Sequence, residues 1–241
     1  FFEKKYFISY IIFSFSILIR PTFELLFPFL VLIHFFIFDK NKLIINFLLY
    51  ILVYIFFMSP WWYFNYIKYD NFVRLHPTVG FMLYSGNNKL NTTGGGIINK
   101  DFKIENFLER KLSDPIKFDN DLKNEAIDYI INNKIVFIKS ALIKLKRFYS
   151  FKLFTSKYSD TILGYIYMLS YLILFILFIS SIIYIPINKY KYLYIFLIMA
   201  FYLTAVHSIT ISSVRYRYPL EIFMIIFSSY PVHKLLNKYL K

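Results

Sequence analysis

Long apolar runs alternate with short charged turns along this chain, and one polar segment interrupts them near the middle. The six apolar runs cover residues 6–19, 21–38, 43–59, 161–185, 190–211 and 219–236. Most of them reach the roughly 20 residues that a helix needs to cross a ~30 Å hydrocarbon core. The pattern therefore predicts an all-α membrane protein with about six transmembrane helices.

The polar segment, residues 60–160, separates the third apolar run from the fourth. It holds 16 of the 28 basic residues and 10 of the 14 acidic residues. A connection of about 100 residues normally has secondary structure of its own. We predict three transmembrane helices in residues 1–59, one extracytoplasmic, α-rich loop domain at 60–160, and three more transmembrane helices in 161–241.

Lysines mark the ends of the apolar runs in four clusters. If every run crosses the membrane, all four clusters lie on one side, which is the cytoplasm because short cytoplasmic loops are rich in positive residues. The polar segment and the turns at Arg20, Arg215 and Arg217 then lie on the outer face. The clusters are Lys4 and Lys5, Lys40 and Lys42, Lys189 and Lys191, and Lys234, Lys238 and Lys241.

The composition agrees with a membrane location. The chain is 58% hydrophobic and 23% aromatic, with a mean hydropathy of +0.52. Its net charge of +14 is spread among the runs and their flanks, which favours contact with anionic lipid over nucleic acid. The absence of cysteine excludes disulfides and thiolate metal sites. The chain begins at Phe1 and lacks a signal-peptide pattern, so we interpret it as the carboxyl-terminal part of a longer protein.

Two arginines, Arg215 and Arg217, lie between the fifth and sixth apolar runs, where charge is costly. Pro219 follows them and suits the first turn of a helix that enters the membrane from outside. Such a helix start presents free N–H groups and the positive end of the dipole, which favour phosphate or carboxylate. Glu221 follows Arg217 by four residues and can orient it from the same helical face.

The turn at Arg20 repeats this arrangement, with Pro21 next in the chain and Glu24 four residues further on. We therefore predict that all three arginines bind an anionic group outside the membrane, oriented by Glu24 and Glu221. The alternative is that the arginines and glutamates are interfacial side chains that reach the membrane surface and neutralise each other.

Glycine is concentrated in the polar segment, with five of the six glycines of the chain at positions 80–96. This concentration indicates backbone conformations that other residues avoid, or the close approach of a ligand. A plain flexible turn is the alternative, and the segment lacks the Gly-Lys-Ser/Thr ending of a nucleotide phosphate loop. The candidate substrate-binding residues are Gly86, Asn87, Asn88, Gly94 and Gly95.

Residues 119–148 have the pattern of one amphipathic helix. Its apolar positions recur at intervals of three and four, and its basic positions lie opposite. A helix at the membrane surface fits this pattern, and so does a helix packed on the outer domain with a solvated basic face. The apolar positions are Ile127, Ile130, Ile131, Ile135, Ile138, Leu142 and Leu145, and the basic positions are Lys134, Lys139, Lys144, Lys146 and Arg147.

No pattern in the chain predicts a metal site. Asp119-Asn120-Asp121 matches an Asp-x-Asp motif that can hold a divalent cation, but it lies at the expected start of the amphipathic helix, where aspartate is typical as a cap. The four histidines lack the paired spacing of a zinc site, and only His76 lies in the outer segment as a candidate site residue. The others are His34, His207 and His233.

Several short motifs follow one another along the chain. They are Ile19-Arg20-Pro21-Thr22, Ser59-Pro60-Trp61-Trp62 with Asn65-Tyr66, Tyr84-Ser85-Gly86-Asn87-Asn88, Thr93-Gly94-Gly95 and Arg215-Tyr216-Arg217-Tyr218-Pro219. In this order and spacing they resemble the carboxyl-terminal half of bacterial membrane glycosyltransferases of the GT-C type, which are related to the protein mannosyltransferases and the lipid A aminoarabinose transferases. The resemblance covers nearly the whole chain.

The resemblance implies a multi-pass enzyme of the bacterial inner membrane. Such an enzyme moves a sugar from a polyprenyl-phosphate carrier to an envelope glycan, lipid or protein on the extracytoplasmic face, with inversion at the anomeric carbon. Arg215, Arg217 and Arg20 would then bind the donor phosphate and stabilise the charge that develops on the leaving group. His76, Tyr218 and the glycine-rich segment would lie against the sugar and acceptor.

We assign no metal-ligating residue and no certain cofactor, and the resemblance gives the polyprenyl-phosphate sugar as the donor substrate. The general-base carboxylate of the family lies near the amino end of those proteins, in a region that this chain does not contain. We therefore assign no catalytic residue here, and we expect the chain to be inactive alone.

Two other classes of function share some of these features. An O-antigen or polysaccharide polymerase or ligase also combines many spans, a large outer loop and outer arginines. A transporter or flippase for an anionic lipid would also present arginines outward, but transporters place polar residues near the middle of the bilayer. Here the interiors of the apolar runs are nearly free of ionisable residues, which favours the transferase over the transporter.

Overall fold

The computed structural model describes residues 6–96, 109, 111–154, 158–185 and 193–239. Over these residues the chain forms helices and no strand, which confirms the predicted all-α class. The helices form two compact units, Phe1–Pro77 and Thr78–Lys241. The predicted boundaries at residues 59 and 160 concern membrane topology, and they stay a prediction.

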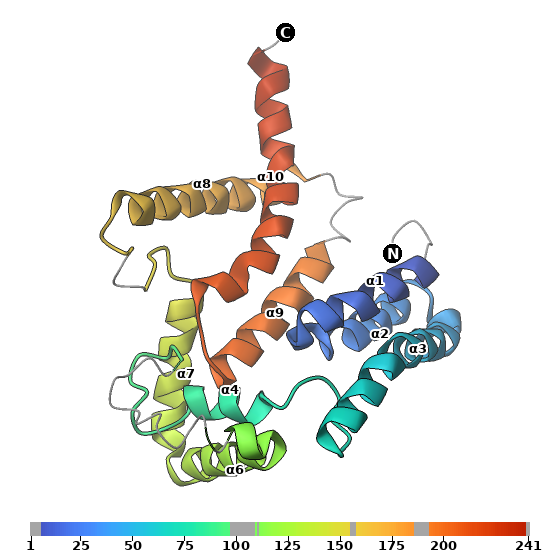
Figure 1. Cartoon of the computed structure of the whole chain (residues 1–241). Helices are drawn as coiled ribbons and strands as arrows, with labels where there is room; N and C mark the ends of the chain where they lie inside the picture. Colours follow the sequence, from blue (N-terminus) through green and yellow to red (C-terminus); the bar gives the residue numbers. More distant parts are fainter. Residues whose placement is uncertain (1–5, 97–108, 110, 155–157, 186–192, 240–241) are drawn as a thin grey trace. The chain divides into compact units, whose positions relative to one another are not determined.

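The first unit consists of three apolar helices joined by short turns (Figure 1). Helices α1 and α2 both pack against α3. Inside the unit the hydroxyl of Tyr10 in α1 donates to Oδ1 of Asn46 in α3 at 3.3 Å, which pairs two buried polar groups between these helices. The elements are α1 (Tyr6–Ile19), η1 (Pro21–Phe23), α2 (Leu26–Phe38), η2 (Lys40–Lys42) and α3 (Leu43–Tyr69).

Helix α3 continues beyond residue 59, where the sequence predicted its end. Pro60 lies inside the helix, so the aromatic residues 61–64 continue it rather than follow it. The helix ends at Asp70, whose φ of 50° is the left-handed conformation common after a helix. After the helix the chain turns back toward it. The side chain of Asn65, inside α3, donates to the carbonyls of Val73 and Leu75 and fixes this returning segment against the helix.

The second unit pairs its helices two by two. Helix α4 packs against α6, α7 packs against α9, and α8 packs against α10 (Figure 1). The polar helices α6 and α7 thus belong to the same unit as the apolar helix α8. The elements are α4 (Val79–Gly86), α6 (Pro115–Asn132), α7 (Lys134–Phe148), α8 (Ile162–Tyr184), α9 (Leu193–Ile209), η4 (Val214–Arg217) and α10 (Tyr218–Tyr239).

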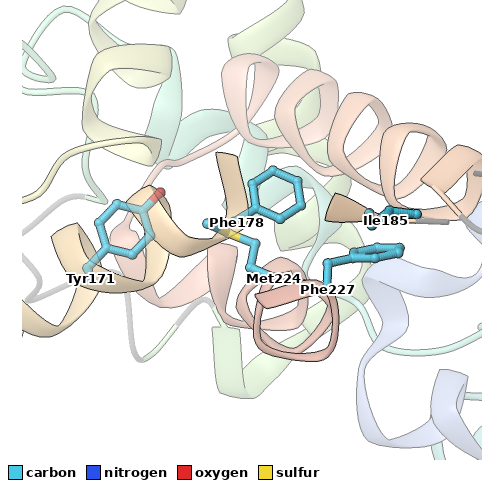
Figure 2. Packing of buried hydrophobic residues seen from close by; sticks show 5 residues of the cluster. All are labelled: Tyr171, Phe178, Ile185, Met224 and Phe227. Carbon is cyan, nitrogen blue, oxygen red and sulfur yellow. The ribbon is translucent and has the colours of Figure 1, made fainter. Parts of the chain in front are cut away.

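A cluster of buried apolar side chains joins α8 to α10. Tyr171 and Phe178 come from α8, Met224 and Phe227 come from α10, and Ile185 follows the end of α8 (Figure 2). Within a membrane such side chains hold two helices together by van der Waals packing, because lipid tails are as apolar as the side chains themselves. The cluster therefore fixes the first half of α10, which carries the turn with the two arginines.

Three helical segments in the described part of the chain are long and apolar enough to cross a membrane: Pro21–Phe38, Lys40–Tyr69 and Ile162–Tyr184. The first and fifth predicted spans form apolar helices of only 14 and 17 residues. The start of the fifth predicted span lies outside the described residues. So do the loop lysines Lys4, Lys5, Lys189 and Lys191 and the terminal Lys241, so the number of spans and their orientation stay predictions.

The predicted amphipathic helix at 119–148 is wrong as a single element, because the structure divides it into α6 and α7. Helix α6 begins earlier, at Pro115, after the N-cap Asp114, whose side chain accepts from the backbone N–H of Lys117 at 2.9 Å. The break falls at Asn133, which leaves the helical conformation at φ −129° and ψ 49°. Its side chain donates to the carbonyl of Tyr129, a local bond that competes with helix continuation.

Candidate functional site

The turn that carries the two arginines joins α9 to α10. After η4, helix α10 begins at Tyr218, with Pro219 next and Glu221 in its first turn. This confirms the predicted helix start directly after the arginines. The first N–H groups of a helix lack partners within it, so this end of α10 favours negative charge.

Arg217 is completely buried, at 0% exposure, and its guanidinium donates in four directions. Nε donates to Oε1 of Glu221 at 2.8 Å, which confirms the predicted pair one helical turn apart. Nη1 donates to the carbonyls of Phe148 and Ser150 at 3.1 and 2.9 Å. Nη2 donates to the hydroxyl of Tyr167 at 2.6 Å.

The ring of Tyr171 covers the same guanidinium at 3.5 Å from its carbon, so the arginine is enclosed by protein. Its bonds join the end of α7, helix α8 and the start of α10. A buried charge with this number of partners stabilises the structure around it, and breaking one partner is costly. The phosphate contact that we predicted for Arg217 stays a prediction, and its contacts favour a positioning role for the turn.

Arg215, in contrast, is exposed. Its Nη2 donates to the hydroxyl of Tyr216 at 3.1 Å, and its guanidinium carbon lies 5.0 Å from the centre of that ring. Tyr216 itself stacks on His207 of α9, with ring centroids 4.2 Å apart and an angle of 8° between the planes. The exposed guanidinium is thus oriented by a ring that a buried histidine supports.

His207 has a structural part that its sequence context did not reveal. Its Nδ1 lies 3.0 Å from the carbonyl oxygen of Ile211, and its ring also stacks on Phe148. The histidine therefore links α7, α9 and the arginine turn. A single histidine in an apolar run carries no signal for such a stacking role, so the sequence reasoning missed it.

The glycine-rich segment is a packing junction in which the backbone of one element meets another. A Cβ atom at Gly86 would lie 1.9 Å from the carbonyl oxygen of Thr210, after α9, and a Cβ at Gly80 would lie 1.8 Å from the carbonyl oxygen of Asp119, in α6. No side chain fits at either distance. The neighbour at these two positions is protein, and the predicted approach of a ligand to the glycine-rich segment stays a prediction.

The two adjacent glycines Gly94 and Gly95 pack on α7. Gly94 has a φ of +72° and lies against Lys144, while Gly95 lies against the guanidinium of Arg147. The carbonyl of Gly94 also accepts from the backbone N–H of Ser212 at 3.0 Å, just before the arginine turn. The predicted substrate segment and the arginine turn are therefore in direct contact.

The asparagines of the predicted substrate segment are buried and bonded to protein. Asn87 donates to the carbonyls of Leu83 and Ile209. The side-chain oxygen of Asn88 accepts from the backbone N–H of Leu90 and of Asn91 and thereby holds the turn. The structure explains both residues through folding, and their contact with a substrate stays a prediction.

Lys144 is completely buried, at 0% exposure. Its Nζ donates to Oδ1 of Asn87 at 2.9 Å and to the carbonyl of Ile209, the last residue of α9, at 3.1 Å. The ammonium thus neutralises the negative end of a helix dipole. Burial lowers the pKa of Lys144 to about 8. The sequence placed this lysine on a basic face opposite the apolar positions, which gave no sign of its burial.

Arg147, one turn later in α7, also faces the glycine-rich segment. Its Nε donates to the carbonyl of Ser212 at 3.0 Å and its Nη1 to the carbonyl of Thr93 at 3.5 Å. Partial burial lowers the pKa of this guanidinium. Arg147 thus binds both the glycine-rich segment, at Thr93, and the residues before the arginine turn, at Ser212. It also adds a positive charge next to that turn.

Asp119 caps a helix other than its own. Its two carboxylate oxygens accept from the backbone N–H groups of Gly80 and Phe81, at 3.0 and 2.9 Å, in the first turn of α4. The prediction that Asp119 caps the start of its own helix is wrong, because Asp114 occupies that position. Over the described residues no group of His, Cys, Asp and Glu is arranged for a metal ion.

The remaining predicted residues lie in the first unit or on the surface. Glu24 accepts from the hydroxyl of Tyr54 and forms a 3.0 Å salt bridge with Arg74, two partners that the sequence did not predict. The guanidinium carbon of Arg20 lies 5.5 Å from the ring of Phe23, and its pairing with Glu24 stays a prediction. His76 in the first unit and Tyr218 at the start of α10 are exposed.

Comparisons of the chain with protein-family models, with curated proteins and with solved structures found no match. The resemblance to GT-C glycosyltransferases therefore depends on the sequence motifs alone.

Proposed function

We propose that this chain is part of a membrane glycosyltransferase that takes its sugar from a polyprenyl-phosphate carrier, with Arg215 at the carrier phosphate. The contrast between the two arginines supports this assignment. Arg217 is buried among protein acceptors, whereas Arg215 is exposed at the start of α10 and oriented by Tyr216. The buried arginine fixes the turn, and the exposed arginine is free to meet a ligand from outside.

The chemistry of such a transfer requires a partner for negative charge. As the bond between sugar and phosphate breaks, charge accumulates on the leaving phosphate, and a fixed cation beside it lowers the barrier. A guanidinium suits this function because its planar donors match two phosphate oxygens at once. The N-terminal end of α10 adds N–H groups and a favourable dipole at the same place.

The proposal includes the topology predicted from the lysine clusters. Six spans would place the arginine turn, the glycine-rich junction and helices α6 and α7 on the extracytoplasmic face of a bacterial inner membrane. Three segments with the length and apolar character of a span support a membrane location. The acceptor would be an envelope glycan, lipid or protein.

The experiment is sugar transfer in membranes from cells that produce the full-length protein of which this chain would be a part, compared with Arg215→Ala and Arg215→Lys in the same protein. Lys123→Ala is the matched control, because Lys123 is an exposed cation on α6 in the same unit. We expect Arg215→Ala to lose turnover by roughly 10- to 100-fold, which corresponds to one charge-assisted hydrogen bond of about 1.5–3 kcal/mol. Unchanged turnover in Arg215→Ala, at equal protein level, would exclude its contact with the phosphate.

A further inference from the structure

Helix α7 exposes an apolar row. Ile135, Ile138, Leu142 and Leu145 recur at intervals of three and four and are 70%, 59%, 57% and 39% exposed. Side chains at this spacing lie on one face of a helix. In a water-soluble domain such a face is directed to the core, so its exposure over about three turns indicates a partner.

The opposite face of α7 carries charge into the protein. Lys144 is buried against Asn87 and the end of α9, and Arg147 binds the carbonyls of Thr93 and Ser212. These bonds fix the rotation of the helix about its axis. The apolar row therefore cannot turn inward without breaking them, and its outward orientation is a built feature of this unit.

The charged residues beside the exposed row favour one kind of partner. Lys139 and Lys146 are exposed, lie seven residues apart, and follow the row along its edge. A protein partner for an apolar face would be apolar itself, whereas an anionic bilayer offers acyl chains to the row and phosphates to the lysines. The chain places a membrane nearby, because α8 begins at Ile162 in the same unit and is long and apolar enough to span one.

We propose that α7 lies in the membrane interface, with the row Ile135, Ile138, Leu142 and Leu145 among the acyl chains and with Lys139 and Lys146 at anionic lipid headgroups. The buried bonds of Lys144 and Arg147 then connect the lipid surface directly to the glycine-rich junction and to the turn of Arg215. This surface is independent of the proposed sugar transfer, and it would be present in a protein of any activity.

The test measures the depth of single positions in the bilayer. The chain contains no cysteine, so one introduced cysteine carries one fluorescent label. We would label Leu142→Cys and Ile138→Cys in the chain reconstituted in phosphatidylglycerol vesicles, with Asn124→Cys in α6 as the exposed polar control. Each label is then quenched from the water by iodide and from the acyl chains by nitroxide lipids. Circular dichroism checks that each variant keeps its helices.

We expect the labels at positions 138 and 142 to be quenched by nitroxide lipids and protected from iodide, and the label at 124 to behave in the opposite way. Iodide access at 142 equal to that at 124 would overturn the proposal. Protection from both quenchers would overturn it too, because the row would then be covered by protein, either a second copy or another part of the chain.

The lysines provide a second, independent measurement. The double variant Lys139→Glu and Lys146→Glu should lose much of the nitroxide quenching at position 142 in phosphatidylglycerol vesicles, with a smaller change in phosphatidylcholine vesicles. An equal change in both types of vesicle would contradict the pairing with anionic headgroups.

Discussion

Nε of Arg217 and Oε1 of Glu221 lie 2.8 Å apart across the first turn of α10, and the arginine is completely buried. The pair is surrounded by three more acceptors of the same guanidinium, on α7, on the segment after it and on α8. The pair therefore stabilises the fold of the turn. It influences a ligand only indirectly, by positioning the neighbouring Arg215.

Arg217→Ala should lower the free energy of unfolding by about 3–5 kcal/mol, because it leaves Glu221 and several buried oxygens without their donor. Arg217→Lys should restore little, since one ammonium cannot reach acceptors in four directions. Denaturation in detergent measures both variants. Arg215→Ala is the control and should unfold like the unchanged chain. An equal loss of stability in Arg215→Ala and Arg217→Ala would contradict the assignment of the structural role to Arg217 alone.

Gly86→Ala and Gly80→Ala should each destabilise the second unit by about 1–3 kcal/mol or more, because the new methyl group would meet a backbone carbonyl below 2 Å. Gly96→Ala is the matched control. Its added Cβ would have its nearest neighbour at 3.9 Å, so we expect a change within about 0.5 kcal/mol. Thermal unfolding compares the three variants, and an equal effect at positions 86 and 96 would mean that the junction is not closely packed.

Asp119→Asn should cost about 1 kcal/mol, because the caps on the first turn of α4 lose their charge. Asp128→Asn changes an exposed aspartate of the same helix and should leave stability nearly unchanged. Hydrogen exchange at the amides of Gly80 and Phe81 gives a local measurement: exchange should become faster in Asp119→Asn alone. Similar exchange in both variants would contradict the capping bonds.

Lys144 should make stability depend on pH. Burial lowers its pKa to about 8 from its usual value of 10.5, so the unfolded chain holds more protons than the folded chain between these two values. Stability from this residue therefore rises with pH across that window and is lowest below pH 8. The melting temperature of the unchanged chain minus that of Lys144→Met should increase as the pH is raised from 8 to 10.5. A difference that stays constant between pH 8 and pH 10.5 would contradict the burial of the Lys144 ammonium.

The sequence predicted the arginine turn well because its signals are local. Pro219 and Glu221 mark a helix start by spacing alone, and the structure has α10 begin there with the predicted salt bridge. The same reasoning failed for residues 119–148. The apolar spacing continues through Asn133, and the change of direction depends on the conformation of that single residue.

Long-range contacts explain what the sequence could not reveal. The sequence placed Lys144 and Arg147 on a basic face, but Lys144 is buried and Arg147 is partly buried. Residues far along the chain, near the glycine-rich segment and before Arg215, offer them hydrogen-bond acceptors. The glycines suggested an unusual backbone or the approach of a ligand, whereas Gly80 and Gly86 lie against the backbone of Asp119 and Thr210. The partner of a backbone position is fixed by tertiary packing, which periodicity does not contain.

The phosphate site at Arg215 is tested most directly by the binding of a polyprenyl phosphate to the chain in detergent. The corresponding polyprenol, which lacks the phosphate, is the matched ligand. Microscale thermophoresis or native mass spectrometry gives both affinities for the unchanged chain, Arg215→Ala and Lys123→Ala, which removes an exposed cation on α6. We predict that Arg215→Ala weakens the phosphate ligand by tenfold or more, as expected for one lost charge-assisted hydrogen bond, and leaves the polyprenol unchanged. Equal affinity for the two ligands, or no effect of Arg215→Ala, would contradict a phosphate site at this turn.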